Sequence, residues 1–208
     1  MKRLFALILL GIVSNARADF ASDFAVVMID DKTEAQLGPF PYDRSVYAKA
    51  IEACARYKAK AVVLKFFFDQ AKSAEGDTAL RDAMKTIPVV LQARLEETDA
   101  TALRIPDKFQ FGSEKPATTI QGDRGWIPLP LLMDAATDVG FVDFADANIP
   151  LVEAYQRKPY KSLVLCCLEQ LTGKLSRADG HGRIFVGDDY LPVDDANTYH
   201  GMLNEAAR

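Results

Sequence analysis

The sequence predicts an α/β fold: an open, mostly parallel sheet with helices on both faces, plus antiparallel strands in the C-terminal half. In the first half of the chain, short continuous apolar runs alternate with helical segments, a pattern typical of strand–helix–strand crossovers. In the second half, short apolar runs are separated by turn residues, which favours hairpins. The chain has 208 residues, 49% hydrophobic and 26% charged, which suffices for one packed domain without a disulfide or a metal.

The N-terminus has the layout of a secretory signal peptide. Two basic residues precede an apolar run over residues 4–13, and small residues stand at the expected cleavage point after Ala18. We therefore expect residues 1–18 to be a cleaved signal peptide and residues 19–208 to form a single domain in the periplasm or outside the cell. The alternative is an uncleaved anchor, but ten helical residues span only about 15 Å, half of a bilayer core.

The mature chain is expected to have no membrane span and no nucleic-acid partner. No later segment reaches about 18 consecutive apolar residues, the length that a spanning helix needs. The formal net charge is −4, so the chain has no basic field for nucleic acid or anionic lipid.

In the N-terminal half we expect three strands and two helices. Continuous apolar runs without alternation are typical of strands buried on both faces of a parallel sheet. The expected strands are residues 24–29, 61–68 and 88–93, and the expected helices are residues 45–58 and 77–85, the second capped by Asp77. Gly38, Pro39 and Pro41 predict a loop before the first helix.

In the C-terminal half the expected elements are shorter. Residues 96–128 are polar and rich in glycine and proline, so we expect a long irregular insertion with at most a short hairpin. The remaining elements are a short helix over 129–136, paired strands over 140–144 and 149–155, an apolar helix over 162–171 closed by Gly173, and a hairpin of 184–186 with 190–193.

The three cysteines, Cys54, Cys166 and Cys167, allow at most one bridge within the chain. Each is either a small buried apolar residue, or Cys54 is bridged to one member of the adjacent pair in an oxidising compartment. The sequence leaves both possibilities open.

Charged residues gather where the first two strands are expected to end. Asp30 and Asp31 follow the first strand, Lys65 and Asp69 lie at the end of the second, and Arg44 begins the helix between them. Ligands of open α/β sheets bind beyond the carboxyl ends of the strands, so these five side chains form a candidate ligand site. Arg44 and Lys65 suit an anionic or zwitterionic ligand, whereas the two adjacent aspartates suit an ammonium group or a divalent cation.

A purely structural role is the alternative for the same residues. Asp31 then caps a turn, and Arg44 pairs with Asp30 or Asp31 to fix the loop. A lysine in an apolar strand is costly unless it is paired, so Lys65 is expected to pair with Asp30 or Asp69 or to reach solvent at the sheet edge.

No catalytic residue, cofactor or metal site is predicted. The chain lacks the glycine-rich loops that hold phosphates and the G-x-S-x-G turn of α/β hydrolases. His181 and His200, the two histidines, lack ligand-like spacing to another histidine or a cysteine. Trp126 is either a packed residue or a recognition aromatic.

Several segments resemble the type-two CHASE domain, an extracellular sensory module associated with cyclases and histidine kinases. In chain order, the resembling segments are 26–31, 37–39, 41–44, 59–63 with Phe68, 140–144, 160–163 and 190–194. The chain departs from the family pattern at Lys65, where the family has an acidic residue, at Phe40, which stands near its usual tryptophan, and over residues 146–152, which lack its arginines. The resemblance implies a sensory α/β domain outside the cytoplasm.

The first functional hypothesis is an exported sensory domain that binds a small molecule without covalent chemistry. The second is an interaction module that docks to a membrane signalling protein through an apolar surface or a strand edge. The third is a metal-assisted hydrolase that uses Asp30 and Asp31.

Overall fold

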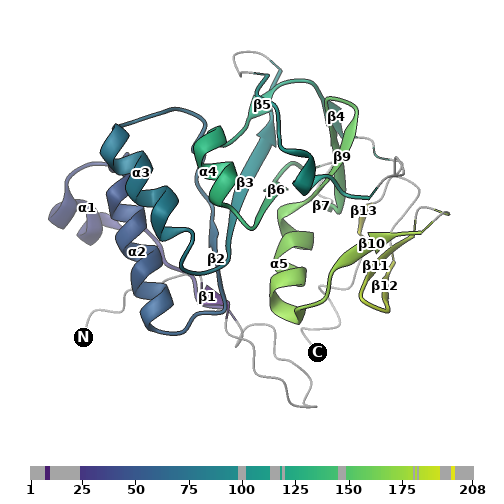
Figure 1. The fold of residues 1–208 in the computed structure, drawn as a ribbon, viewed down its shortest axis with the longest axis horizontal. Helices are drawn as coiled ribbons and strands as arrows, with labels where there is room; N and C mark the ends of the chain where they lie inside the picture. Colours follow the sequence, from purple (N-terminus) through teal and green to yellow (C-terminus); the bar gives the residue numbers. More distant parts are fainter. Residues whose placement is uncertain are drawn as a thin grey trace.

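The computed structural model describes residues 8–9, 24–97, 102–112, 118, 120–144, 149–179, 181, 183–192 and 198–199. These residues form a central, mostly parallel sheet with helices on both faces and small, mainly antiparallel sheets beside it (Figure 1), which confirms the predicted fold class. The predicted cleavage point after Ala18 lies outside the described residues.

Three parallel strands form the centre of the molecule: β2 (Ala61–Leu64), β3 (Val89–Leu95) and β6 (Asp138–Phe141). β3 lies between the other two, with Val63 opposite Val90 on one side and Gln92 opposite Gly140 on the other. The sheet is extended by β1 (Ile8–Leu9), antiparallel to β2, and by β5 (Gly125–Trp126), antiparallel to the end of β3. The predicted second and third strands are therefore confirmed, although β2 ends at Leu64.

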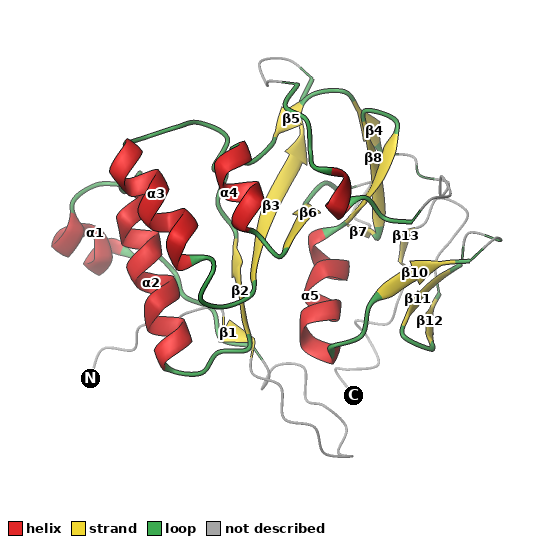
Figure 2. Ribbon diagram, viewed as in Figure 1, coloured by secondary structure: helices red, strands yellow, loops and turns green. Residues whose placement is uncertain are grey.

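Helices cover the two faces unequally (Figure 2). The helices are α1 (Asp31–Leu37), α2 (Arg44–Arg56), α3 (Ala74–Ala83), the 3-10 helix η2 (Asp107–Phe109), α4 (Pro130–Ala135) and α5 (Leu163–Thr172). Buried residues of α2, α3 and α4 pack on one face of the sheet, whereas α5 packs on the other. The predicted helices over 45–58, 129–136 and 162–171 are confirmed, and Gly173 closes α5 at a φ of 70°.

Asp77 does not cap α3, so this prediction is wrong. The cap is Ser73, whose hydroxyl accepts the Gly76 N–H at 3.0 Å. The Ser73 hydroxyl also donates to Asp43, the cap of α2, at 2.6 Å, so the two helix starts are joined. A Cβ on Gly76 would lie 2.6 Å from the Asp43 carboxylate, so this close approach requires glycine.

The C-terminal half contains three small sheets, and its antiparallel strands are confirmed. Their strands are β4 (Gln121–Gly122), β8 (Val152–Tyr155) and β9 (Lys158–Lys161); β10 (Ser176–Ala178), β11 (Ile184–Val186) and β12 (Asp189–Leu191); and β7 (Ile149–Pro150) with β13 (Thr198–Tyr199). The predicted pairing of 140–144 with 149–155 is wrong, because β6 pairs with β3 and β8 pairs with β4 and β9. An apolar run predicts a strand but does not specify its neighbour.

The predicted strand over residues 24–29 is also not formed. Residues 25–30 have no regular structure, and Val26 and Met28 are 48% and 66% exposed. The position beside β2 is held by β1, which comes from the segment predicted to be a signal peptide. The prediction of a strand over 24–29 is therefore wrong.

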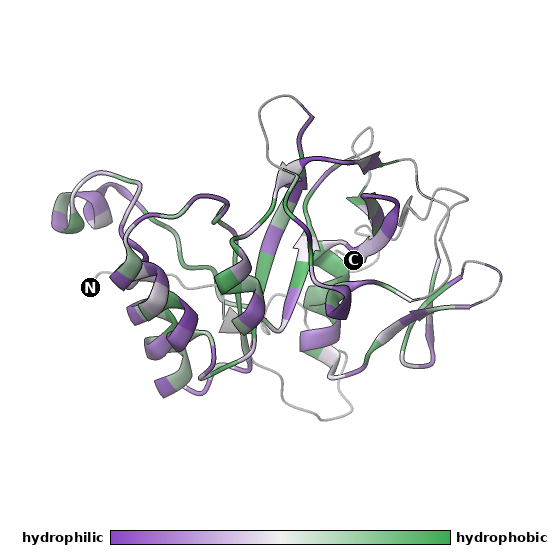
Figure 3. Cartoon of the chain, turned by 45° about the horizontal axis from the view of Figure 1, so that its top comes forward, coloured by the Kyte–Doolittle hydropathy of each residue, from purple (hydrophilic) through white to green (hydrophobic). Residues whose placement is uncertain are grey.

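The sheet has two unlike faces, which we name the helical-core face and the α5 face. Val62, Val89 and Leu91 point to the helical-core face, into a large apolar cluster with α2, α3 and α4. Val63 and Val90 point to the α5 face, into a small cluster with Cys166. β2 is hydrophobic throughout, and the hydrophilic residues of β3 are Gln92 and Arg94, toward its carboxyl end. Figure 3 shows this predominance of hydrophobic residues in the centre of the sheet, with hydrophilic ones among them.

The three cysteines are free. Cys54 belongs to the helical-core face and Cys166 to the α5 face, so the sheet separates them. The possible bridge from Cys54 is therefore not formed.

Candidate ligand site at the carboxyl ends of the parallel strands

A hollow of about 700 Å³ opens where β2, β3 and β6 end, on the α5 face. α5 begins beside β6, because Gly140 has no side chain; a Cβ there would lie 2.5 Å from the Leu163 Cα. The hollow is lined by Lys65, Phe67, Gln92, Arg94, Phe141, Val142, Asp143, Phe144, Ile149, Leu163 and Val164.

A second hollow of about 380 Å³ adjoins the first. The two share Lys65, Phe67 and Gln92 in their linings. The second is completed by Phe40, Pro41, Arg44, Tyr47, Phe66, Phe68, Asp69, Gln70 and Lys72. Together they form one crevice along the ends of the parallel strands, which is where open α/β sheets bind their ligands.

Gln92 is an unsatisfied polar residue at the junction of the two hollows. It is only 3% exposed, and its Oε1 is buried with no hydrogen-bond donor among the described residues. A buried amide oxygen without a donor is costly, so such an atom in a native fold requires an explanation. A donor on a bound molecule would satisfy it.

Lys65 is exposed at the same junction, and no carboxylate among the described residues pairs with it. The predicted pairing with Asp30 or Asp69 is therefore wrong, and the alternative, that Lys65 reaches solvent at the sheet edge, holds. Its ammonium group is available to an anion.

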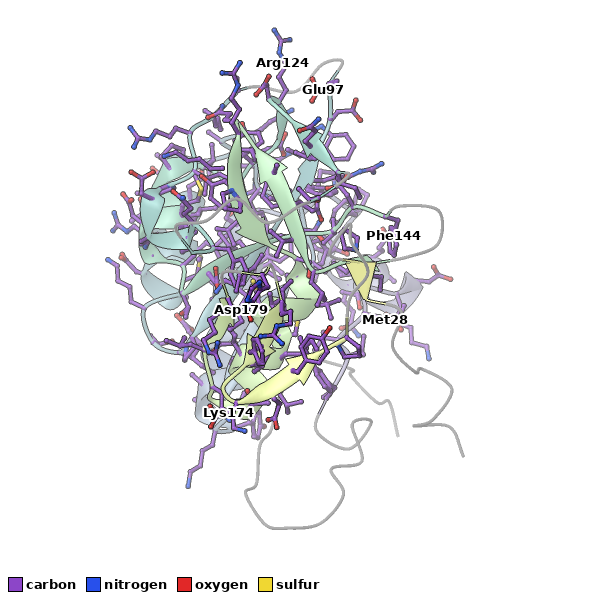
Figure 4. The ribbon with its side chains drawn as sticks, turned by 90° about the vertical axis from the view of Figure 1, so that its right-hand side faces the viewer. Met28, Glu97, Arg124, Phe144, Lys174 and Asp179 are labelled. Carbon is purple, nitrogen blue, oxygen red and sulfur yellow. The ribbon has the colours of Figure 1, made fainter. Side chains whose placement is uncertain are left out.

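Arg94 supplies a second cation, on the upper rim of the hollow. Its side chain is 47% exposed, its guanidinium lies 5.2 Å from the Trp126 ring centroid, and its Nε lies 3.8 Å from Asp143. Trp126 also packs edge-on against Phe67 at 4.7 Å, so it serves as a packed residue that supports the lining. Phe144 lies on the rim and projects from the surface (Figure 4).

Asp143 and Glu153 form a pair of carboxyl groups beside Arg94. Asp143 accepts the Leu95 N–H at 3.0 Å, whereas Glu153 is fully buried and has no donor for either oxygen among the described residues. Burial and the nearby Asp143 raise the pKa of Glu153 to about 10, so Glu153 is neutral at pH 7. Nothing in the local sequence indicates this burial of Glu153. A glutamate in an otherwise apolar short strand is normally predicted to face solvent.

The structure brings three of the five predicted site residues together, since Arg44, Lys65 and Asp69 all line the second hollow. The Arg44 guanidinium is already engaged, with Asp77 at 3.3 Å, the Gln70 carbonyl at 2.8 Å and the Phe68 ring centroid at 4.3 Å. The suggested structural pairing of Arg44 with Asp30 or Asp31 is therefore wrong.

Asp30 and Asp31 lie apart from both hollows. Asp30 caps α1: it accepts the Thr33 hydroxyl at 2.7 Å and the Thr33 N–H at 2.9 Å, and these bonds lower its pKa. Asp31 is the exposed first residue of α1. Neither lines the crevice, and their assignment as ligand residues stays a prediction.

A buried ionic cluster lies on the α5 face, away from the hollow. The Lys161 ammonium contacts the carboxylates of Asp138 and Glu169, the latter at 2.7 Å. Glu169 also accepts the Ser176 N–H at 2.7 Å. Each charge in the cluster has a partner, so we assign it to stability and not to binding.

Among the residues that the structure describes, no three or more histidine, cysteine, aspartate or glutamate side chains are grouped so that they could share a metal ion. Within the same residues, no helix has the length and apolarity to cross a bilayer.

The fold and the crevice define an α/β domain with a candidate ligand site at the carboxyl ends of its parallel strands. The chain belongs to the CHASE2 domain family, whose model matches residues 3–202. CHASE2 domains are extracellular sensory domains, so the resemblance seen in the sequence is confirmed. Neither the curated proteins nor the solved structures include a match to the chain.

Proposed function

We propose that this chain is an exported sensory domain that recognises a small molecule, without covalent chemistry, in the crevice at the ends of β2, β3 and β6. The observation that carries the proposal is that Gln92, whose buried Oε1 has no donor among the described residues, lines the crevice together with Lys65, which pairs with no described carboxylate. Membership of an extracellular sensory family supports it, as does the position of the crevice in the sheet.

The test is a thermal-melting screen of the purified protein against a broad set of small metabolites. A ligand that binds the folded state raises Tm by mass action. The matched variants are Val164→Trp, which fills the mouth of the larger hollow, and Leu175→Trp, which places the same side chain at an exposed position that lines neither hollow. We expect the Tm shift to disappear in the first variant and to persist in the second; a shift that survives in both would place the ligand elsewhere.

We further propose that the chain acts in the periplasm or outside the cell after cleavage behind Ala18. The family and the signal-peptide layout of the first 18 residues support this placement. Intact-mass measurement of the protein recovered from the periplasm is expected to give the mass of residues 19–208. Recovery of the full-length mass from the membrane would contradict it.

Docking to a membrane signalling protein is the second candidate function. It is favoured by the consecutive exposed side chains of Val26, Val27 and Met28. Figure 4 shows Met28 at the surface. The test is a photo-crosslinking residue in place of Met28 and, as a control, in place of Lys49 on α2. A discrete membrane-protein adduct at the first position alone would support docking, and equal labelling at both would exclude it.

A further inference from the structure

We propose that the ligand of this crevice is a small carboxylate that carries a hydrogen-bond donor beside the carboxylate, as amino acids and 2-hydroxy acids do. The inference rests on the proposed function, because it requires that the crevice binds a small molecule. It follows from the polar groups that line the larger hollow and from what each of them lacks.

The cationic groups call for an anion. Lys65 has no carboxylate partner among the described residues, and Arg94 is half exposed, with its Nε 3.8 Å from Asp143. Leu163 and Val164, the first two residues of α5, place the positive end of that helix in the same lining. Two cations and a helix amino end together suit an anionic group.

The acid in the lining restricts the charge of that anion. Asp143 contributes a carboxylate to the hollow, and the neutral Glu153 lies beside it. A dianion such as a phosphate monoester would face repulsion from Asp143, whereas a monoanionic carboxylate leaves the net charge of the lining balanced. The ammonium group of an amino acid would find Asp143 as a partner.

Gln92 is the reason that the ligand is expected to carry a hydrogen-bond donor. Gln92 lines both hollows, and its Oε1 is buried and receives no hydrogen bond from the described chain. An N–H or O–H next to the carboxylate would satisfy this oxygen while the carboxylate lies against Lys65. Phe67, Val142 and Phe144 leave an apolar wall for the body of the ligand.

The experiment is isothermal titration of the purified protein with matched sets of compounds. Each standard amino acid is compared with its 2-hydroxy analogue, with the carboxylate of the same carbon skeleton that lacks the 2-substituent, and with the neutral amide; inorganic phosphate is included. We expect at least one donor-bearing carboxylate to bind, with affinity about tenfold lower when the 2-substituent is removed or the carboxylate is made an amide.

Two variants locate the contacts. Lys65→Gln is expected to weaken binding about tenfold, whereas Lys49→Gln, an exposed lysine on α2, leaves it unchanged. Gln92→Met removes the unsatisfied oxygen at nearly constant shape, so it is expected to lower affinity and to raise the Tm of the ligand-free protein. A lower Tm in Gln92→Met would show that the oxygen has a structural partner and would overturn the donor argument.

Failure of the carboxylate inference can be distinguished from failure of the proposed function. If phosphate, a cation or a neutral compound binds and Val164→Trp abolishes that binding, the carboxylate inference is overturned while the proposed function stands. If no compound of any class shifts Tm or gives heat, both are overturned.

Discussion

Different interactions stabilise the two faces of the central sheet. The helical-core face buries a continuous apolar cluster under α2, α3 and α4, and its one buried ion pair is Arg44 with Asp77. The α5 face has a small apolar cluster, a buried ionic triad around Lys161, and an open hollow with an unsatisfied amide. The same strands supply both faces, since successive side chains point to opposite sides.

This difference separates stability from recognition. The helical-core cluster is mainly apolar, so it stabilises the fold with little dependence on pH, although the buried Tyr42 hydroxyl within it has no hydrogen-bond partner among the described residues. Buried polar groups cost free energy unless they are paired, and an unpaired one persists where a ligand can pair with it. We therefore expect substitutions in the helical-core cluster away from the hollows to affect stability alone, and those that line either hollow, Tyr47 and Phe68 of that cluster included, to affect binding.

The largest effect is expected from Lys161→Met on the α5 face. The change leaves two buried carboxylates, Asp138 and Glu169, without their cation, at a cost of about 3–5 kcal/mol in the free energy of unfolding. Arg44→Met on the other face leaves one carboxylate, which keeps the Lys72 N–H at 3.0 Å, and is expected to cost about 2 kcal/mol. Urea unfolding measures both, with Lys49→Met as the control.

The pH dependence of the stability lost in Lys161→Met distinguishes the contribution of the lysine charge from that of the packing of its side chain. Burial raises the pKa of Asp138 even in the wild-type protein, so in the variant this carboxyl group takes up a proton as the pH falls, and the loss is expected to shrink. A loss that is constant with pH would mean that the lysine stem, and not its charge, stabilises the fold.

The next effect compares one residue type on the two faces. Leu80 of α3 is fully buried in the helical-core face, and Leu80→Ala is expected to cost about 3 kcal/mol. Leu163 of α5 is half-buried at the hollow, so Leu163→Ala is expected to cost about 1 kcal/mol, because solvent or a ligand fills the space. Equal losses in the free energy of unfolding would contradict the inference that solvent or a ligand can reach the α5 face at Leu163. Urea unfolding of both variants decides between these outcomes.

The sequence predicted the elements whose patterns are local. β3 follows from an uninterrupted apolar run, and α5 from a serine cap at one end and Gly173 at the other. The strand predicted over 24–29 is wrong, because residues 25–30 have no regular structure. An apolar run forms a strand only where the backbone of another segment pairs with it, and the pattern of one segment does not specify that partner.

The site was predicted in part for a similar reason. Lys65 was found because it lies at the end of a predicted strand, and the same rule applied to the third strand would have found Gln92 and Arg94. Arg44 was assigned to the ligand because its partner, Asp77, lies on a different helix. Burial of Glu153 depends on distant segments that pack over it, so its altered pKa could not be read from its neighbours in the chain.

A moderate, stabilising effect is expected from Glu153→Gln. The unfolded carboxyl group titrates near its ordinary value of 4.5, whereas burial and Asp143 raise the folded pKa to about 10. The folded state therefore holds a proton that the unfolded state releases, so stability is full below pH 4.5 and is lost as the pH rises toward 10. At pH 7 this costs about 3 kcal/mol, from 2.5 pH units at about 1.36 kcal/mol each.

Glu153→Gln removes that titration, so we expect it to raise stability at pH 7 by about 2 kcal/mol and to flatten the pH dependence. Urea unfolding at pH 5, 7 and 8.5 measures both effects, with Glu52→Gln on the exposed side of α2 as the control. A destabilised variant with an unchanged slope would show that Glu153 is charged in the folded state.

The smallest effect is expected at Asp30, the predicted ligand residue that the fold uses as a cap. Asp30→Ala removes the acceptor of the Thr33 N–H, so α1 is expected to fray, with severalfold faster amide exchange over residues 31–37. α1 has no buried residue, so global Tm should not move. Ligand affinity is the decisive measurement: if it falls in Asp30→Ala as it does in Lys65→Gln, Asp30 contributes to recognition. If it is unchanged, recognition is confined to the crevice on the α5 face.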